Sequence, residues 1–265
     1  MGHVRLGKPP ATREWRQVID LLGAQKLVVA EIAAAVERSA DRSLATAVQD
    51  PGFVESFWLL LKIPQAIATD DPQLALKSLG IIVPPDPGIA DLTAGFEAAF
   101  ERYRRRSFVG FTDFAFIARD AAIATLAGLA NELGPRLWTS RPEDERATIA
   151  GFASSTASGE LAQTFFTHVL RGHIRYFLDR EIPRHIGVGH ALTSVTDAEY
   201  FDEAVRRHCR ETTIIMRAFA RDWMGKNRFH LGKEIGREDA AALASHALDK
   251  IRAELNRRSG KVAAA

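Results

Sequence analysis

Histidines gather in one short stretch of the chain, RGHIRYFLDREIPRHIGVGH, which spans residues 171–190 and also holds two carboxylates. Imidazole and carboxylate groups are common metal ligands, and they are also the usual proton donors and acceptors of acid–base catalysis. His173 lies in this stretch, and His208 and Glu211 follow it at a mutual spacing of three residues. These three residues are therefore the candidates for a catalytic or metal-binding site.

The spacing of apolar residues predicts one helix over 159–182 and another over 197–224, with His173 and His208 each inside the apolar stripe of its helix. Because the connection has only about fourteen residues, the simplest arrangement is an antiparallel hairpin. Each histidine is roughly 15–16 Å from that connection at the usual helical rise, so the two could meet at one level. Glu211 can reach the same face as His208.

Three interpretations of these histidines stay open. They could belong to a metal-dependent or acid–base enzyme whose site lies between the two helices. They could be hydrogen-bonded across a helix interface, or they could make an interface sensitive to pH. The sequence contains no HExxH motif and no carboxylate–histidine pattern repeated on two helices, as di-iron bundles require. The second interpretation is favoured, and no metal ion or other cofactor is expected.

Other motifs of catalysis are absent from the sequence. Cys209 is the only cysteine, and its position beside His208 on a helix makes a buried apolar role the expectation. The segment ASSTASG at 153–159 lacks the GxSxG pattern of a nucleophile elbow. The glycines of GVG and GKEIG lack the strand–loop–helix context of a phosphate loop. The sequence therefore leans away from an enzyme.

The segment ERYRRR at 101–106 concentrates positive charge around one tyrosine, through Arg102, Arg104, Arg105 and Arg106. Such a cluster could contact phosphates, which makes a nucleic-acid accessory protein a second alternative. A helix C-terminus also attracts cations, which gives the same residues a structural role. The whole chain has 35 basic and 33 acidic residues and a net charge of +2, which is too balanced to indicate nucleic acid.

The segment FVESFWLLLKIPQ at 53–65 is apolar nearly all round when drawn as a helix. A helix of this kind is either central to a core or presents one side to another protein. Phe57, Trp58 and Leu61 are the residues with which we expect it to bind a partner protein.

Helix signals divide the rest of the chain. Asp-Pro occurs at 50–51, 71–72 and 86–87, where aspartate can cap a helix that begins with proline. The segment TDAE at 196–199 has the pattern of a capping box. The predicted helices cover 12–23, 25–48, 51–68, 72–79, 87–106, 111–133, 141–156, 159–182, 197–224 and 237–258. The fold class is therefore all-α, a multi-helix bundle of roughly nine or ten helices.

The segment IIVPPDPG at 81–88 is the most plausible boundary within the chain. It would separate an N-terminal helical region, 1–82, from a main helical bundle, 83–265. One continuous domain over 1–265 is the alternative, because the segment is short.

Composition points to a folded, soluble protein, with 46% hydrophobic and 26% charged residues. The N-terminal residues have no apolar run of signal-peptide type, and the longest apolar stretches have about ten residues, so we expect a cytoplasmic protein without a membrane partner. Arginine makes up 27 of the 35 basic residues, a bias typical of GC-rich bacterial genomes. The leading prediction is a non-enzymatic helical interaction or accessory subunit of a bacterial multi-protein assembly.

Overall fold

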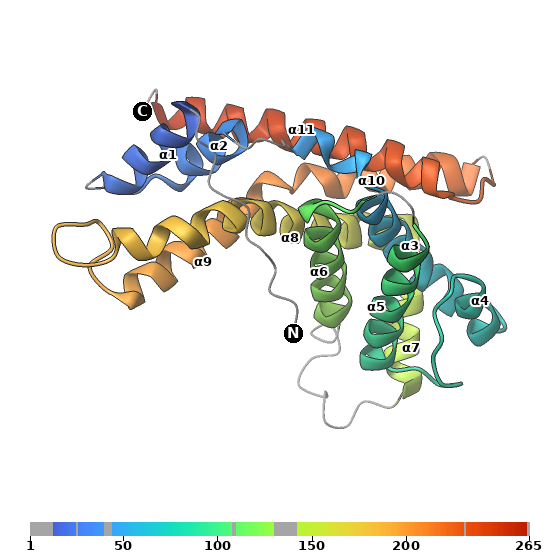
Figure 1. Cartoon of the computed structure of the whole chain (residues 1–265). Coiled ribbons are helices and arrows are strands. Elements are labelled where there is room, and N and C mark those ends of the chain that lie inside the picture. The colour runs from blue at the N-terminus through green and yellow to red at the C-terminus, as the bar shows by residue number, and fades with distance from the viewer. Residues whose placement is uncertain are drawn as a thin grey trace. The chain divides into compact units, whose positions relative to one another are not determined.

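The computed structural model describes residues 13–24, 26–39, 44–107, 110–129, 142–230 and 232–263. In these residues the secondary structure is helical, and the bridge between Ile186 and Leu192 is isolated (Figure 1). The predicted all-α class is therefore confirmed. Among the described helices, none has the length and apolar character that crossing a membrane requires.

The elements follow one another along the chain without strands between them in the described residues. Short 3₁₀ segments are η1 (Leu44–Gln49) and η3 (Ile182–His185), and η4 (Gly225–His230) is π-helical. The α-helices are α1 (Arg13–Gly23), α2 (Val29–Ser39), α3 (Pro51–Ile67), α4 (Pro72–Ser78), α5 (Ile89–Arg106), α6 (Asp113–Gly128), α7 (Pro142–Gly151), α8 (Ser155–Glu181), α9 (Val195–Thr212), α10 (Ile215–Met224) and α11 (Arg237–Ala263).

Two of the three Asp-Pro pairs cap helices as predicted. At the start of α3, the Asp50 side chain accepts a hydrogen bond of 2.8 Å from Gly52 N. At the start of α4, the Asp71 side chain accepts a hydrogen bond of 2.9 Å from Leu74 N. The prediction for 86–87 is wrong, because α5 begins two residues later with Gly88 as its N-cap. Asp91, inside the helix, accepts from Gly88 N at 3.0 Å and closes that end.

Two predicted helices are divided in the structure. The range 197–224 separates into α9 and α10 at the run Thr212–Ile215, whose four β-branched side chains lose rotamer freedom in a helix. The Thr213 hydroxyl bonds the Thr167 hydroxyl at 2.7 Å at this break. The range 25–48 contains α2 and η1, and residues 40–43 between them lie outside the described residues.

The chain divides into two compact units, each made of segments far apart in the sequence. Unit 1 consists of 1–46, 170–212 and 248–265, and unit 2 consists of 47–169 and 213–247. The division of the chain into 1–82 and 83–265 stays a prediction.

Unit 2 is organised around α3, which contacts α4, α5, α6 and α7 (Figure 1). Gly52 lets α3 approach α6 closely, since a Cβ added there would lie 2.6 Å from the Ala115 Cβ. Phenylalanine rings fill the centre: Phe57 stacks on Phe165 with centroids 4.9 Å apart and contacts Phe166 at 5.1 Å. The most apolar helix of the chain is therefore the core of unit 2.

That position corrects the partner-binding prediction for Phe57, Trp58 and Leu61. Their exposed fractions are 0%, 8% and 3%, so these side chains pack inside the unit. The Trp58 indole N–H donates to the Ile235 carbonyl at 3.0 Å, and the Arg237 guanidinium lies 3.8 Å from the Trp58 ring centroid. A helix that is apolar all round fits either the core of a domain or a partner-binding surface. Here the helix forms the core.

Candidate functional site

His173, on α8 in unit 1, lies against a buried carboxylate that the sequence did not indicate. Its Nε2 is 3.0 Å from the Glu37 Oε2 of α2, and the two side chains are 2% and 6% exposed. Glu37 also accepts from Arg252 Nε of α11 at 2.8 Å and from the Leu44 amide at 3.2 Å. We call Glu37, His173 and Arg252 the buried ionic cluster, after its buried carboxylate; the Arg252 side chain itself is 38% exposed.

The buried ionic cluster has the contacts of a packing network. Each oxygen of Glu37 faces at least one donor, as a buried carboxylate requires. His173 also packs edge-on against Phe177, with ring centroids 5.5 Å apart. Little of His173 and Glu37 is therefore exposed to solvent.

His208, on α9 in the same unit, is 8% exposed, and its Nε2 is buried without a hydrogen-bond partner among the described residues. Burial, and then the nearby Arg258 charge, lower the pKa of His208 below the ordinary value of 6.5. The imidazole is therefore neutral at neutral pH. A neutral ring in an apolar stripe fits burial at a helix interface, but Nε2 does not make the hydrogen bond that the favoured interpretation expects.

Glu211 and His173 pair with different residues. Its Oε2 accepts from Arg258 Nη1 of α11 at 2.8 Å, and 53% of its side chain is exposed. Arg258 also donates to Glu254 at 2.8 Å. Across the described residues, no group of three or more His, Cys, Asp or Glu side chains could hold a metal ion. His173 and Glu211 thus each have a partner of their own.

Cys209 is fully buried, and burial raises the pKa of its thiol to about 12. A thiol of this kind stays protonated at physiological pH and is a poor nucleophile. The expectation of a buried apolar role is met by this environment.

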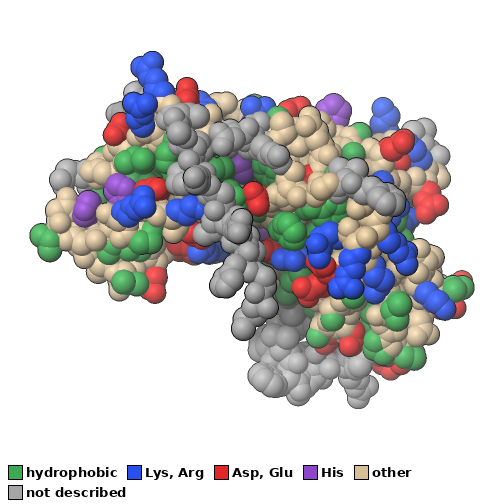
Figure 2. All heavy atoms as spheres, viewed as in Figure 1, with side chains coloured by type: hydrophobic (Ala, Val, Ile, Leu, Met, Phe, Trp, Pro, Cys, Tyr) green, Lys and Arg blue, Asp and Glu red, His purple; other side chains and the backbone are tan. Residues whose placement is uncertain are grey.

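The arginine cluster at 101–106 divides between paired and exposed side chains. Arg102 donates to the Gly80 carbonyl, and Arg104 forms an ion pair with Glu101 at 2.8 Å. Arg105 and Arg106 are exposed in the last turn of α5, where cations complement the helix dipole. On the visible face in Figure 2, basic side chains are interspersed with acidic ones. Half of the predicted basic patch is thus engaged in contacts within unit 2.

A surface depression beside α4 in unit 2 combines features of a protein-binding site. Its volume is about 550 Å³. Leu74 of α4 and Ile82 of the following loop line it, with 63% and 70% of their surface exposed. Figure 2 shows hydrophobic side chains at the surface in the region of α4. We call this feature the α4 depression; its other lining residues are Asp71, Gln73, Lys77, Ile81 and Val83.

Local structure explains why these apolar residues face outward. In α4, Leu76 is fully buried and takes the core-facing position, so Leu74, two residues earlier, points to the other side. Ile81 and Val83 flank Ile82 in an extended segment and are 0% and 9% exposed. Sequence reasoning missed this site, because neither Leu74, near Leu76 in α4, nor Ile82, between Ile81 and Val83, differs in type from its buried neighbours.

Comparison of the chain with protein-family models, with curated proteins and with solved structures found no significant match.

Proposed function

We propose that this protein is a non-enzymatic helical interaction or accessory subunit that binds a partner protein through the α4 depression. The observation that carries the proposal is the joint exposure of Leu74 and Ile82 in one depression. They are two of the seven exposed large hydrophobic side chains of the described residues, and single exposed residues of that type are ordinary. Two in the same depression are a local apolar surface.

The chemistry of the depression indicates what the partner presents to it. Its floor takes an apolar side chain, and burying the exposed parts of Leu74 and Ile82 would contribute about 1–2 kcal/mol each. Lys77 is exposed at the rim, whereas the Asp71 side chain is engaged in capping α4. A partner segment with an apolar residue next to an acidic one fits this arrangement.

Wider parts of the proposal rest on the sequence. We place the subunit in a cytoplasmic multi-protein assembly of a bacterium, on the basis of composition and arginine usage. The predicted antiparallel hairpin is proposed for α8 and α9, which the short segment 182–194 joins. An ion pair of 2.6 Å between Arg171 of α8 and Asp202 of α9 supports that pairing.

The test is co-purification of the tagged chain with its partner. It compares the unchanged protein with a variant that has a charged residue in the α4 depression. Ile82→Asp should lower the affinity for the partner at least about ten-fold, because it puts a carboxylate in an apolar contact. Val195→Asp is the matched control, since Val195 has a similar exposed fraction, 68% against 70%, and lies in unit 1. Equal retention of the partner by both variants would contradict the proposal.

A further inference from the structure

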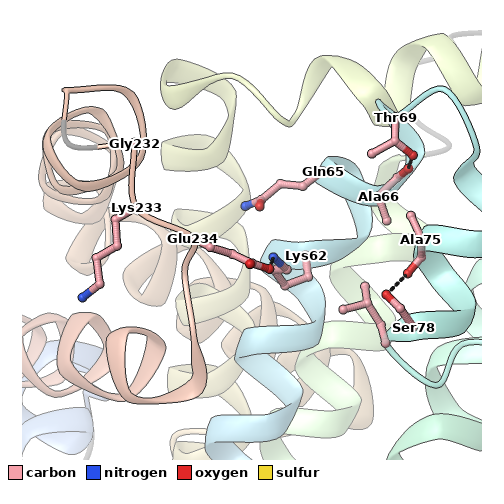
Figure 3. Close-up of a pocket in the computed structure, with 10 residues that line it drawn as sticks. Lys62, Gln65, Ala66, Thr69, Ala75, Ser78, Gly232, Lys233 and Glu234 are labelled. Carbon is pink, nitrogen blue, oxygen red and sulfur yellow. Dashed lines mark hydrogen bonds and ion pairs between the residues drawn. The ribbon is translucent and has the colours of Figure 1, made fainter.

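A second hollow of unit 2 lies on the other side of α4 and has no part in the proposed partner binding. It has a volume of about 460 Å³, which is within the range of small-molecule sites. The C-terminal half of α3, α4 and the segment Gly232–Glu234 enclose it (Figure 3). We call it the Lys62 pocket, after the cation in its wall.

Two donor groups mark the Lys62 pocket, the Lys62 ammonium and the Gln65 amide. Lys62 is only 9% exposed, and its ammonium carries three N–H donors. Lys62 is paired with Glu234, whose Oε1 lies 2.8 Å from the Nζ. The Gln65 Nε2 is buried without a partner among the described residues. Figure 3 shows the Gln65 side chain extending from α3 toward the segment that carries Glu234.

Glu234 is a solvent-exposed residue whose carboxylate contacts Lys62 in the pocket. Its side chain is 86% exposed, and a hydrogen bond from Lys62 lowers its pKa below the ordinary value. It lies in a non-helical segment before α11, so it can leave Lys62 without breaking a helix. The neighbouring Lys233 is directed elsewhere and pairs with Asp239. The contact between Glu234 and Lys62 shows that a carboxylate fits at this position.

Apolar side chains form part of the wall. Ala66, Ala75 and Leu79 line the pocket alongside its polar residues. A ligand that matches both parts has one carboxylate and a short hydrocarbon body. A phosphate matches less well, because the wall has no cluster of arginines and its second lysine, Lys233, is paired with Asp239.

We propose that the Lys62 pocket binds a small organic carboxylate. The ligand's carboxylate replaces that of Glu234 at Lys62 and accepts a hydrogen bond from Gln65. Its hydrocarbon body lies against Ala66, Ala75 and Leu79. Glu234 thereby competes with the ligand, and binding moves this residue into solvent.

The test uses octanoate as the probe, with octanamide as its uncharged analogue, in calorimetric titrations of the full chain. Octanoate should bind about ten-fold more tightly than octanamide, the difference expected for one charge-assisted interaction. Gln65→Leu should weaken octanoate binding by about the same factor. Glu234→Gln should strengthen it about three- to five-fold, because the competing charge is gone.

Two variants keep the test decisive. Glu234 is exposed, so Glu234→Gln will fold even if Gln65→Leu does not. Lys226→Met is the control, because Lys226 is an exposed lysine of η4 that does not line the pocket, and it should leave octanoate binding unchanged. Equal binding of octanoate and octanamide would overturn the proposal. So would a Glu234→Gln protein that binds octanoate no better than the unchanged chain.

Discussion

The two units bury different chemistry. The interior of unit 1 contains the buried ionic cluster, in which Glu37 receives His173 and Arg252 from two other helices. The interior of unit 2 is built on stacked phenylalanine rings around Phe57. In unit 1 one buried carboxylate receives contacts from two other helices. Unit 2 also has a buried carboxylate, Glu55, which Arg237 reaches, but phenylalanine rings occupy the centre of its core.

The difference teaches where function can be sought. The histidines of unit 1 have the residue types of an active site, but their contacts are those of a helix interface. The aromatic helix of unit 2 has the composition of a partner surface, but it is the core. Two features of the described residues that remain available to other molecules are the α4 depression and the Lys62 pocket, which are less conspicuous in the sequence.

The largest expected effect comes from removing a ring from the core of unit 2. Phe57→Ala should lower the free energy of unfolding by about 3–5 kcal/mol, because it deletes a fully buried aromatic side chain. Urea denaturation measures this change. Tyr200→Ala is the control, since Tyr200 is 70% exposed, and it should change stability by less than about 0.5 kcal/mol. Similar losses in both variants would mean that Phe57 is not central to the core.

A smaller effect is expected in the buried ionic cluster of unit 1. Glu37→Gln should cost about 2–3 kcal/mol, because Arg252 and His173 lose a charged acceptor. Glu211→Gln is a matched control, since Glu211 also pairs with an arginine of α11 but is 53% exposed, and it should cost less than about 1 kcal/mol. If both substitutions cost the same in urea denaturation, the cluster contributes no more than a surface ion pair.

His208 should give unit 1 a dependence on pH. Its pKa is lowered in the folded protein, so the unfolded chain binds more protons as the pH falls below about 6.5. Stability should therefore decrease toward acid, by at most about 1.4 kcal/mol per pH unit from this one group. His208→Gln should reduce the slope, measured by urea denaturation between pH 7 and pH 5. An unchanged slope would show that protonation of His208 is not coupled to folding.

The smallest effect is expected from thiol modification, because the Cys209 thiol should not react in the native protein. A buried thiol with a pKa raised to about 12 should resist iodoacetamide at pH 8, and the urea-unfolded chain should be modified completely. Mass spectrometry distinguishes the two, since Cys209 is the only cysteine. Rapid modification of the native protein would indicate that α9 opens locally or that the thiol is accessible.

Local signals made much of the fold predictable. The caps at Asp50 and Asp71 fixed the starts of α3 and α4, because a side-chain acceptor and a proline act within one turn. The start of α5 was misplaced, since Asp91 reaches back to Gly88 and makes the earlier Asp-Pro pair unnecessary. The break between α9 and α10 could have been found from four consecutive β-branched residues.

Long-range contacts made the candidate sites harder to predict. The burial of His173 followed from its apolar stripe, but nothing near it in the sequence indicated Glu37, which comes from a distant segment. The pattern of α3 could not distinguish a core from a partner surface. Leu74 and Ile82 became recognisable only when folding placed them in one depression.

The most direct test of the partner-binding account is site-specific photo-crosslinking in the cells that produce the protein. A photo-reactive amino acid at Leu74 should capture one partner protein, and Ile82→Asp should abolish that product. The same amino acid at Ile214, which is 62% exposed against 63% for Leu74, should not capture it. Capture of a second copy of this chain, or of the same proteins from both positions, would contradict the account.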